Sequence, residues 1–150
     1  MSQHFCYAHP RPALTVDIVV LSSDRHVLLI RRKNEPFKGA FALPGGFMEI
    51  DETLADAAAR ELQEETGLAG LQLERLRVFD APDRDPRGRT VSLAFLATTA
   101  GRPKPTAGDD ADDARWLPLD DLPAMAFDHG EIIACALRSV ARSASAAKPD

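Results

Sequence analysis

Two stretches near the start of the chain are rich in Val, Ile and Leu. They are residues 13–21 (ALTVDIVVL) and residues 26–32 (HVLLIRR). Runs of this composition predict β-strands, and the polar residues 22–24 (SSD) between them predict a turn. We therefore expect a hairpin. Residues 34–47 (NEPFKGAFALPGGF) follow as a predicted loop, because proline and glycine interrupt this segment repeatedly.

The pattern changes at residues 51–66 (DETLADAAARELQEET), which consist largely of good helix formers. Asp51 is the predicted N-cap of this helix, and Gly67 is the predicted stop at its C-terminal end. The chain is thus expected to pass from a strand region through a loop into a helix.

The second half of the chain mixes strand-like and helix-like segments. Strands are predicted over residues 71–79 and 90–99, and the alternation in the first predicts one shared face for Leu71, Leu73, Arg75, Arg77 and Phe79. After these we expect, in order, a polar loop over 100–113, a short strand over 114–117, an amphipathic helix over 131–142 and a frayed tail over 143–150. No internal repeat or long linker divides the sequence, so one domain over residues 1–150 is predicted. The order of strands and helices predicts the α/β class, with a mixed sheet covered on both faces.

Charge and composition narrow the classes of function. The formal net charge is −5 without a long basic run, which argues against a nucleic-acid partner, since phosphate backbones require clustered Lys and Arg. The sequence has neither the apolar core of a signal peptide nor an apolar run of membrane-spanning length. Cys6 and Cys135 match no metal or disulfide spacing and are expected to be reduced thiols. These features predict a cytoplasmic protein that binds neither nucleic acid nor membrane.

Three glutamates of the predicted helix carry the most informative pattern. Glu61, Glu64 and Glu65 are spaced i, i+3 and i+4, so their side chains share one face of the helix. Such a face is either a solvated acidic surface or a site for a hard divalent cation, which prefers carboxylate oxygens. The small apolar residues Ala57 and Ala58 project on the same side as Glu61 and Glu65, which turns that side toward the protein. The metal site is therefore the favoured interpretation.

Residues 46–68 (GFMEIDETLADAAARELQEETGL) resemble the Nudix box, Gly-x5-Glu-x7-Arg-Glu-U-x-Glu-Glu-x-Gly-U, with every specified position filled. The resemblance implies a Nudix-type α/β/α sandwich and a hydrolase that depends on Mg²⁺, with Mn²⁺ as the other candidate cofactor. By position, the implied metal ligands are the carbonyl of Gly45 and the carboxylates of Glu61, Glu64 and Glu65. Arg60 completes the implied catalytic set by orienting these glutamates. Glu52 is implied to hydrogen-bond within the loop, although an acid favoured by the helix dipole explains it equally well.

Three flanking segments resemble ADP-ribose pyrophosphatases, including the Nudix half of bifunctional nicotinamide mononucleotide adenylyltransferases. They are residues 11–21, 83–97 and 107–133. This resemblance implies a small-molecule nucleoside diphosphate as the partner and the cleavage of ADP-ribose to AMP and ribose 5-phosphate. The alternatives are hydrolysis of oxidised nucleoside triphosphates or of dinucleotides, and an ADP-ribose sensor without catalysis. By analogy with ADP-ribose-cleaving relatives, a homodimer is also predicted.

Further candidate residues lie outside the box. A water that attacks a diphosphate must lose a proton to a carboxylate. The acceptor is either a box glutamate or one of four aspartates, Asp109, Asp110, Asp112 and Asp113. The candidates for substrate binding are Arg84, Arg87, Arg89 and Phe47. The arginines would contact phosphate or the second ribose, with surface solubility as the alternative, and Phe47 would stack on adenine, with packing as the alternative. His129 is assigned to a capping turn before the last helix.

Overall fold

The computed structural model describes residues 4–108 and 111–147. This part of the chain forms one seven-stranded sheet, in the order β3-β2-β1-β6-β5, with β4 paired to β1 and β7 paired to β2. The strands are β1 (Ala13–Ser22), β2 (His26–Arg32), β3 (Phe41–Ala42), β4 (Gly45–Phe47), β5 (Glu74–Phe79), β6 (Thr90–Thr99) and β7 (Ala111–Pro118). The helices are α1 (Leu54–Thr66) and α2 (His129–Ala146). Parallel and antiparallel pairs occur together, which confirms the predicted α/β class with a mixed sheet.

The pairing of β1 creates the opening in which a site can form. β1 runs parallel to β6 along its whole length, from Ala13 opposite Thr90 to Ser22 opposite Thr99. The predicted hairpin is present, but β1 and β2 pair antiparallel only near their turn. Toward the start of β1, the short strand β4 takes the place of β2 and pairs with residues 15–17. The sheet is therefore split at this end between β1 with β4 and the departing strand β2.

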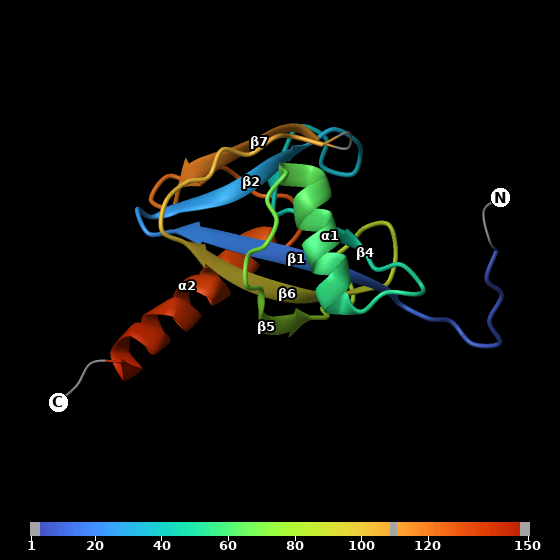
Figure 1. Ribbon diagram of the computed structural model, residues 1–150. Coiled ribbons are helices and arrows are strands. Elements are labelled where there is room, and N and C mark those ends of the chain that lie inside the picture. Colours follow the sequence, from blue (N-terminus) through green and yellow to red (C-terminus); the bar gives the residue numbers. More distant parts are fainter. Residues whose placement is uncertain (1–3, 109–110, 148–150) are drawn as a thin grey trace.

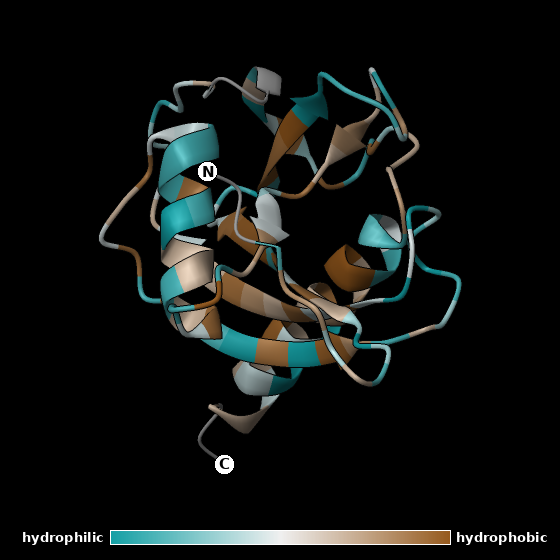
Figure 2. Cartoon of the chain, turned by 90° about the vertical axis from the view of Figure 1, so that its right-hand side faces the viewer, coloured by the Kyte–Doolittle hydropathy of each residue, from teal (hydrophilic) through white to brown (hydrophobic). Residues whose placement is uncertain are grey.

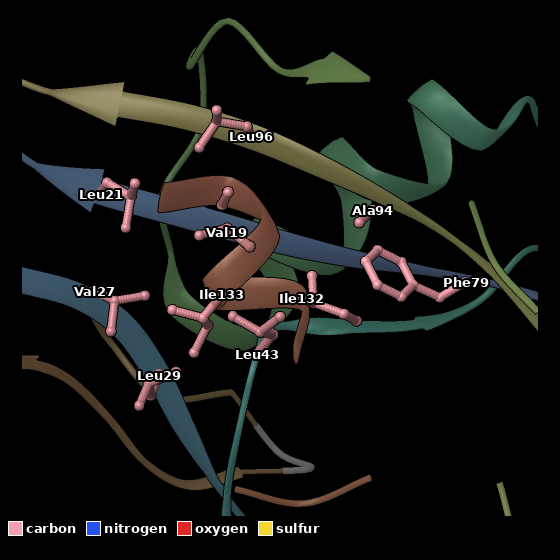
Figure 3. Packing of buried hydrophobic residues seen from close by; sticks show 11 residues of the cluster. Val19, Leu21, Val27, Leu29, Leu43, Phe79, Ala94, Leu96, Ile132 and Ile133 are labelled. Atoms are coloured by element: carbon pink, nitrogen blue, oxygen red, sulfur yellow. The ribbon is translucent and has the colours of Figure 1, made fainter. Parts of the chain in front are cut away.

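The two helices cover opposite faces of the sheet (Figure 1). Successive residues of a strand point to opposite faces, so β1 supplies side chains to both layers of the core. On the α1 side the buried cluster contains Val16, Ile18, Val20, Ala57, Ala58 and Leu62. On the α2 side it contains Val19, Leu21, Leu43, Ile132, Ile133 and Ala136 (Figure 3). Figure 2 shows the same division, with hydrophobic colour on the strands between the helices and hydrophilic colour along α1.

The box helix starts later than the sequence predicted. Thr53, not Asp51, is the N-cap, because its hydroxyl accepts a hydrogen bond from the backbone N–H of Asp56 at 3.1 Å. The predicted stop at Gly67 is confirmed: this residue has a left-handed φ of 73°, and its N–H donates to the carbonyl of Gln63 at 2.8 Å.

The strand predicted over residues 71–79 is shorter and less regular than its alternation suggested. It begins at Glu74, and its register against β6 shifts between Arg75 and Arg77. A shift of this kind reverses which side chains face which side. Leu71 packs into the α1-side cluster, whereas Phe79 packs into the α2-side cluster. The prediction of one shared face was therefore wrong.

Two boundaries near the C-terminus also differ from the prediction. The strand predicted over 114–117 begins at Ala111, because pairing with β2 extends it as far as Arg32. The last helix begins at His129 and continues to Ala146, so the segment predicted as a frayed tail is helical up to that residue. Alanine in this segment favours the helix. In the described part of the chain, neither helix is both long and apolar enough to cross a membrane.

Candidate active site

A pocket of about 480 Å³ lies at the split end of the sheet. Its wall comes from β1, the end of β2, the segment from Leu43 through β4 to α1, and the loop between β5 and β6. The acidic residues that line it are Asp17, Glu35, Glu49, Glu61, Glu65 and Asp85. The basic residues are Arg32, Lys33, Arg60, Arg84 and Arg87. Because both signs of charge meet in one cavity, the pocket suits a ligand that combines anionic groups with a bridging cation.

Arg60 is the centre of the charge network on α1. It donates to Glu52 from Nε at 3.0 Å and from Nη2 at 2.5 Å, and to Glu61 from Nη1 at 2.9 Å. It also reaches Glu64 at 3.3 Å and the carbonyl of Phe47 at 3.1 Å. The hydrogen bonds from Arg60 hold the pKa of Glu52 at about 2, far below its ordinary value. Arg60 therefore ties the loop before α1 to the acidic face of the helix.

The backbone of Gly45 faces the acidic residues of α1. On either side of this position, Ile18 donates to the carbonyl of Pro44, and Met48 donates to the carbonyl of Leu14. In an antiparallel pair, residues that hydrogen-bond to the partner strand alternate with residues that do not. Gly45 is one of the latter, so its N–H and C=O point away from β1. Its N–H donates to Oε2 of Glu65 at 3.0 Å. The carbonyl of Gly45 is thus directed away from the ladder and is free of pairing with β1.

Glycine is required at both positions of this segment by close approach. A Cβ atom on Gly45 would lie 2.1 Å from the carbonyl oxygen of Val16. A Cβ atom on Gly46 would lie 2.4 Å from Oε1 of Glu61. Both distances are far below a normal nonbonded contact. Gly46 therefore leaves room for the carboxylate of Glu61, whereas Gly45 allows the segment to approach β1 closely.

The donor set on this wall suits a hard divalent cation. It consists of carboxylate oxygens and one backbone carbonyl, the ligands that Mg²⁺ and Mn²⁺ accept. Burial raises the pKa of Glu61 despite the opposing effect of Arg60, so this carboxylate gains from a nearby positive charge. Glu64 is more exposed, at 59% of its side chain. Among the side chains that the structure describes, no three acidic, His or Cys groups are arranged to hold a metal ion as they stand. Arg60 contacts two of the proposed ligands, Glu61 and Glu64.

Arg84 is buried beneath the basic side of the pocket. It forms two hydrogen bonds to Asp128, at 2.9 Å and 2.7 Å, and its side chain is only 4% exposed. It also lies 3.5 Å from Asp17. Arg89 instead donates to the carbonyl of Asp80 at 2.8 Å and is not part of the pocket wall. The three arginines predicted as one cluster therefore have three different environments.

Arg87 and two phenylalanines form the outer part of the same wall. Its guanidinium carbon lies 5.0 Å from the ring centre of Phe47 and 5.5 Å from that of Phe127. Asp85 holds Arg87 in place through hydrogen bonds of 2.8 Å and 3.0 Å. Arg32 lies 5.0 Å from the Phe127 ring, and burial together with the charge of Arg87 lowers its pKa. Two guanidinium groups thus face one aromatic ring inside the pocket.

Comparison with known proteins decides the family. The model of the NUDIX domain matches residues 11–136. The chain belongs to the NUDIX domain family. The box residues 46–68 thus occupy the loop, helix and loop that begin at β4 and end after α1.

Some of the relatives have ADP-ribose in their names. An ADP-ribose pyrophosphatase of Methanocaldococcus jannaschii is 47% identical over 89% of this chain and 76% of its own length. An ADPR responsive transcriptional repressor, NtrR of Acinetobacter baylyi, is 33% identical over 83% of this chain, which spans about half of that protein (53%). The NUDIX domain of Shewanella oneidensis NrtR, solved in complex with ADP ribose, superposes with a TM-score of 0.82 at 32% identity. That comparison covers 89% of this chain and 91% of the domain. The chain is thus an enzyme of the Nudix hydrolase type by sequence, and the predicted α/β/α fold is confirmed.

Several residues of the Nudix pocket were not predicted from the sequence. Asp17, His129, Arg32 and Phe127 all line it. An aspartate within the apolar run of β1 was a signal for Asp17, because a buried charge needs partners. Phe127 gave no such signal: it depends on a φ of 52°, which costs a bulky residue about 1–3 kcal/mol. His129 does not serve a capping turn alone, because its side chain is buried and contacts both β1 and the segment before β4.

The aspartates proposed as proton acceptors lie only partly within the described residues. Asp109 and Asp110 lie outside them. Asp112 belongs to β7, not to a loop, and its side chain is not among those described. Asp113 also belongs to β7, and its carboxylate accepts a hydrogen bond from the guanidinium of Arg115. Asp113 is not part of the pocket wall.

Proposed function

We propose that this protein hydrolyses the diphosphate bond of ADP-ribose, giving AMP and ribose 5-phosphate, with Mg²⁺ as cofactor and Mn²⁺ as a substitute. The observation that carries the proposal is the pocket in which the acidic face of α1 meets an arginine- and phenylalanine-lined wall across Gly45 and Gly46. A volume of about 480 Å³ lies in the range of pockets for small ligands. The 47% identity to an ADP-ribose pyrophosphatase supports the choice of substrate.

The cation would be held by the carbonyl of Gly45 and the carboxylates of Glu61, Glu64 and Glu65. When bound, it supplies the positive charge that offsets the diphosphate oxygens and lowers the pKa of an attacking water. Arg60 holds Glu61, which lines the pocket, and also contacts Glu64, which is more exposed and does not line it. The contact of Gly45 N–H with Glu65 aligns the backbone ligand with the helix.

The substrate would lie against the opposite wall. Arg87 and Arg32 present positive charge to the phosphates, and the rings of Phe47 and Phe127 present flat apolar faces to the adenine or ribose groups. Arg84 is committed to Asp128, so we assign it a positioning role behind Arg87. Arg89 is the weakest candidate of the three, since it is held by the carbonyl of Asp80 and does not line the pocket.

The attacking water must pass its proton to a carboxylate. A carboxylate bound to a cation is a poor base, because the cation stabilises its charged form. We therefore propose an acid outside the box, from the segment that carries Asp109, Asp110 and Asp112. Asp113 is the least suited of this cluster, because it pairs with Arg115. Glu61 or Glu64 is the alternative base.

A substrate panel tests the proposal. With Mg²⁺ present, kcat/KM is measured for ADP-ribose, NADH, diadenosine polyphosphates and 8-oxo-dGTP. We expect the highest value for ADP-ribose, with AMP as a product. A higher value for 8-oxo-dGTP would replace the proposal with nucleotide sanitation. Tight binding of ADP-ribose without turnover would instead indicate a sensor. One relative is named as an ADPR responsive repressor. We also propose that the protein is cytoplasmic and forms a homodimer.

A further inference from the structure

The segment between β3 and β4 depends on a single side chain of α2. β3 ends at Ala42 and β4 begins at Gly45, so Leu43 lies in neither strand. Leu43 is only 2% exposed, and its backbone N–H donates to Nδ1 of His129 at 3.0 Å. Without this acceptor, a buried N–H would lose its hydrogen bond, which is costly. The imidazole thus takes the place of a sheet partner.

The second nitrogen of His129 is bound as well. Nε2 lies 3.2 Å from Oδ1 of Asp17, which is itself buried in β1. Since Nδ1 accepts the N–H of Leu43, the ring proton lies on Nε2 and is donated to Asp17. Asp17 also accepts a hydrogen bond from Ser92 at 2.5 Å and lies 3.5 Å from Arg84. Burial alone would raise the pKa of Asp17, but His129, Ser92 and Arg84 together hold it below its ordinary value.

Each residue from Leu43 to Gly45 is anchored to a different element. The side chain of Leu43 packs beside Ile132 and Ile133 of α2 (Figure 3). The carbonyl of Pro44 accepts the N–H of Ile18 in β1 at 2.9 Å. The N–H of Gly45 binds Glu65 of α1. A shift of Leu43 therefore passes through two residues to the backbone carbonyl that is the proposed metal ligand.

We infer that His129, held by Asp17, is a positioning residue that sets the affinity of the site for its divalent cation. The inference rests on the metal site of the proposed function but not on the identity of the substrate. His129 touches neither the cation nor the substrate in this role; it fixes Leu43, and Leu43 fixes Gly45. Direct hydrogen-bond partners of metal ligands typically change metal affinity about 10- to 100-fold when lost. His129 acts one step further away, through Leu43, so we expect an effect at the lower end of this range.

Two substitutions separate the two contacts of the imidazole. Asparagine places its carbonyl oxygen near the position of Nδ1, so His129→Asn keeps an acceptor for the N–H of Leu43. Glutamine places its amide near the position of Nε2, so His129→Gln keeps a donor for Asp17 and loses the acceptor for Leu43. Leu96→Val is the matched control, because it removes one buried methylene from the same core cluster, on β6 and away from Leu43 (Figure 3).

The test measures binding of Mn²⁺ to the full chain by electron paramagnetic resonance of the free ion, beside the free energy of unfolding of each metal-free variant in urea. We expect His129→Gln to raise the Kd for Mn²⁺ about tenfold. His129→Asn and Leu96→Val should keep the wild-type Kd, even where they lower stability. An unchanged Kd in His129→Gln would overturn the inference, as would a Kd that follows stability across all three variants.

Two further outcomes are distinguishable. If His129→Gln does not fold, His129→Ala takes its place, since it also removes the acceptor for the N–H of Leu43. A wild-type Kd in His129→Ala would then overturn the inference. If the wild-type protein itself does not bind Mn²⁺, the metal site and the proposed function fail together. Normal binding by the wild type with no effect of His129 refutes the positioning role alone.

Discussion

Replacing Gly46 by alanine introduces one methyl group directly against a proposed metal ligand. The new Cβ would lie 2.4 Å from Oε1, 2.6 Å from Cδ and 2.8 Å from Oε2 of Glu61. All three atoms belong to the flexible end of a side chain, so the carboxylate must move while the backbone stays in place. A normal contact between such atoms is about 3.5 Å, so the displacement is about 1 Å.

The expected effect on activity is large, and the effect on stability is small. A displacement of about 1 Å in a catalytic group can cost about 100-fold in rate, or about 2.7 kcal/mol in the barrier. Moving Glu61 off its preferred rotamer and away from Arg60 costs about 1 kcal/mol of unfolding free energy. Gly46→Ala should therefore fold normally and turn over slowly.

The assay is kcat for ADP-ribose at saturating Mg²⁺, with urea unfolding on the same preparation. Gly101→Ala is the matched control, because a Cβ at Gly101 meets no atom within 4 Å. The control should keep the wild-type kcat. A kcat for Gly46→Ala within about threefold of wild type, or ~0.7 kcal/mol, would refute the argument that Glu61 must stay where Gly46 allows it.

Three further predictions concern single acids. Glu65→Gln should lower kcat by about 100-fold or more at saturating Mg²⁺ and leave the fold intact, because it removes a ligand charge but keeps the shape. Asparagine at one aspartate within residues 109–113 should lower kcat at least about tenfold, ~1.4 kcal/mol, with little change in KM; Asp113→Asn is expected to have the smallest effect. The stability that Glu52 gains from Arg60 should be fully present above pH 4.5 and be lost as the pH falls toward about 2, its pKa in the folded protein.

A specific result would contradict each of these three predictions. Near wild-type turnover in Glu65→Gln would remove that residue from the ligand set. Wild-type kcat across the pH range in all four aspartate variants would move the proton acceptor to the box glutamates. For Glu52, the difference in unfolding free energy between wild type and Glu52→Gln is measured from pH 7 to pH 2. A difference that stays constant down to pH 2 would show that Arg60 does not depress this pKa.

The sequence predicted those parts of the fold that depend on local patterns. The runs of β1, β2 and β6 and the helix formers of α1 specify their elements with few competing structures. Boundaries failed where tertiary contacts decide them. Pairing with β2 extends β7, and the shift between Arg75 and Arg77 reverses the faces of β5. The cap at Thr53 depends on one contact, in which its hydroxyl accepts the N–H of Asp56. The sequence did not exclude a similar cap by the carboxylate of Asp51.

For the site, too, the sequence predicted the residues that local spacing brings together and missed those that distant contacts bring together. Fixed spacing on one helix brings Glu61 and Glu65 to the pocket, and this needs only the helical period. Asp17 and His129 are more than a hundred residues apart, and only the packing of α2 against the sheet brings them within 3.2 Å. No local sequence pattern around His129 predicts that contact.

Incubation of ADP-ribose with the wild-type protein, followed by chromatographic separation of the products, tests the central claim most directly. With Mg²⁺ present, AMP and ribose 5-phosphate should appear in equal amounts, and chelation of the metal should stop their formation. ADP-ribose that binds to the protein and remains intact at every concentration of Mg²⁺ and Mn²⁺ would contradict the account.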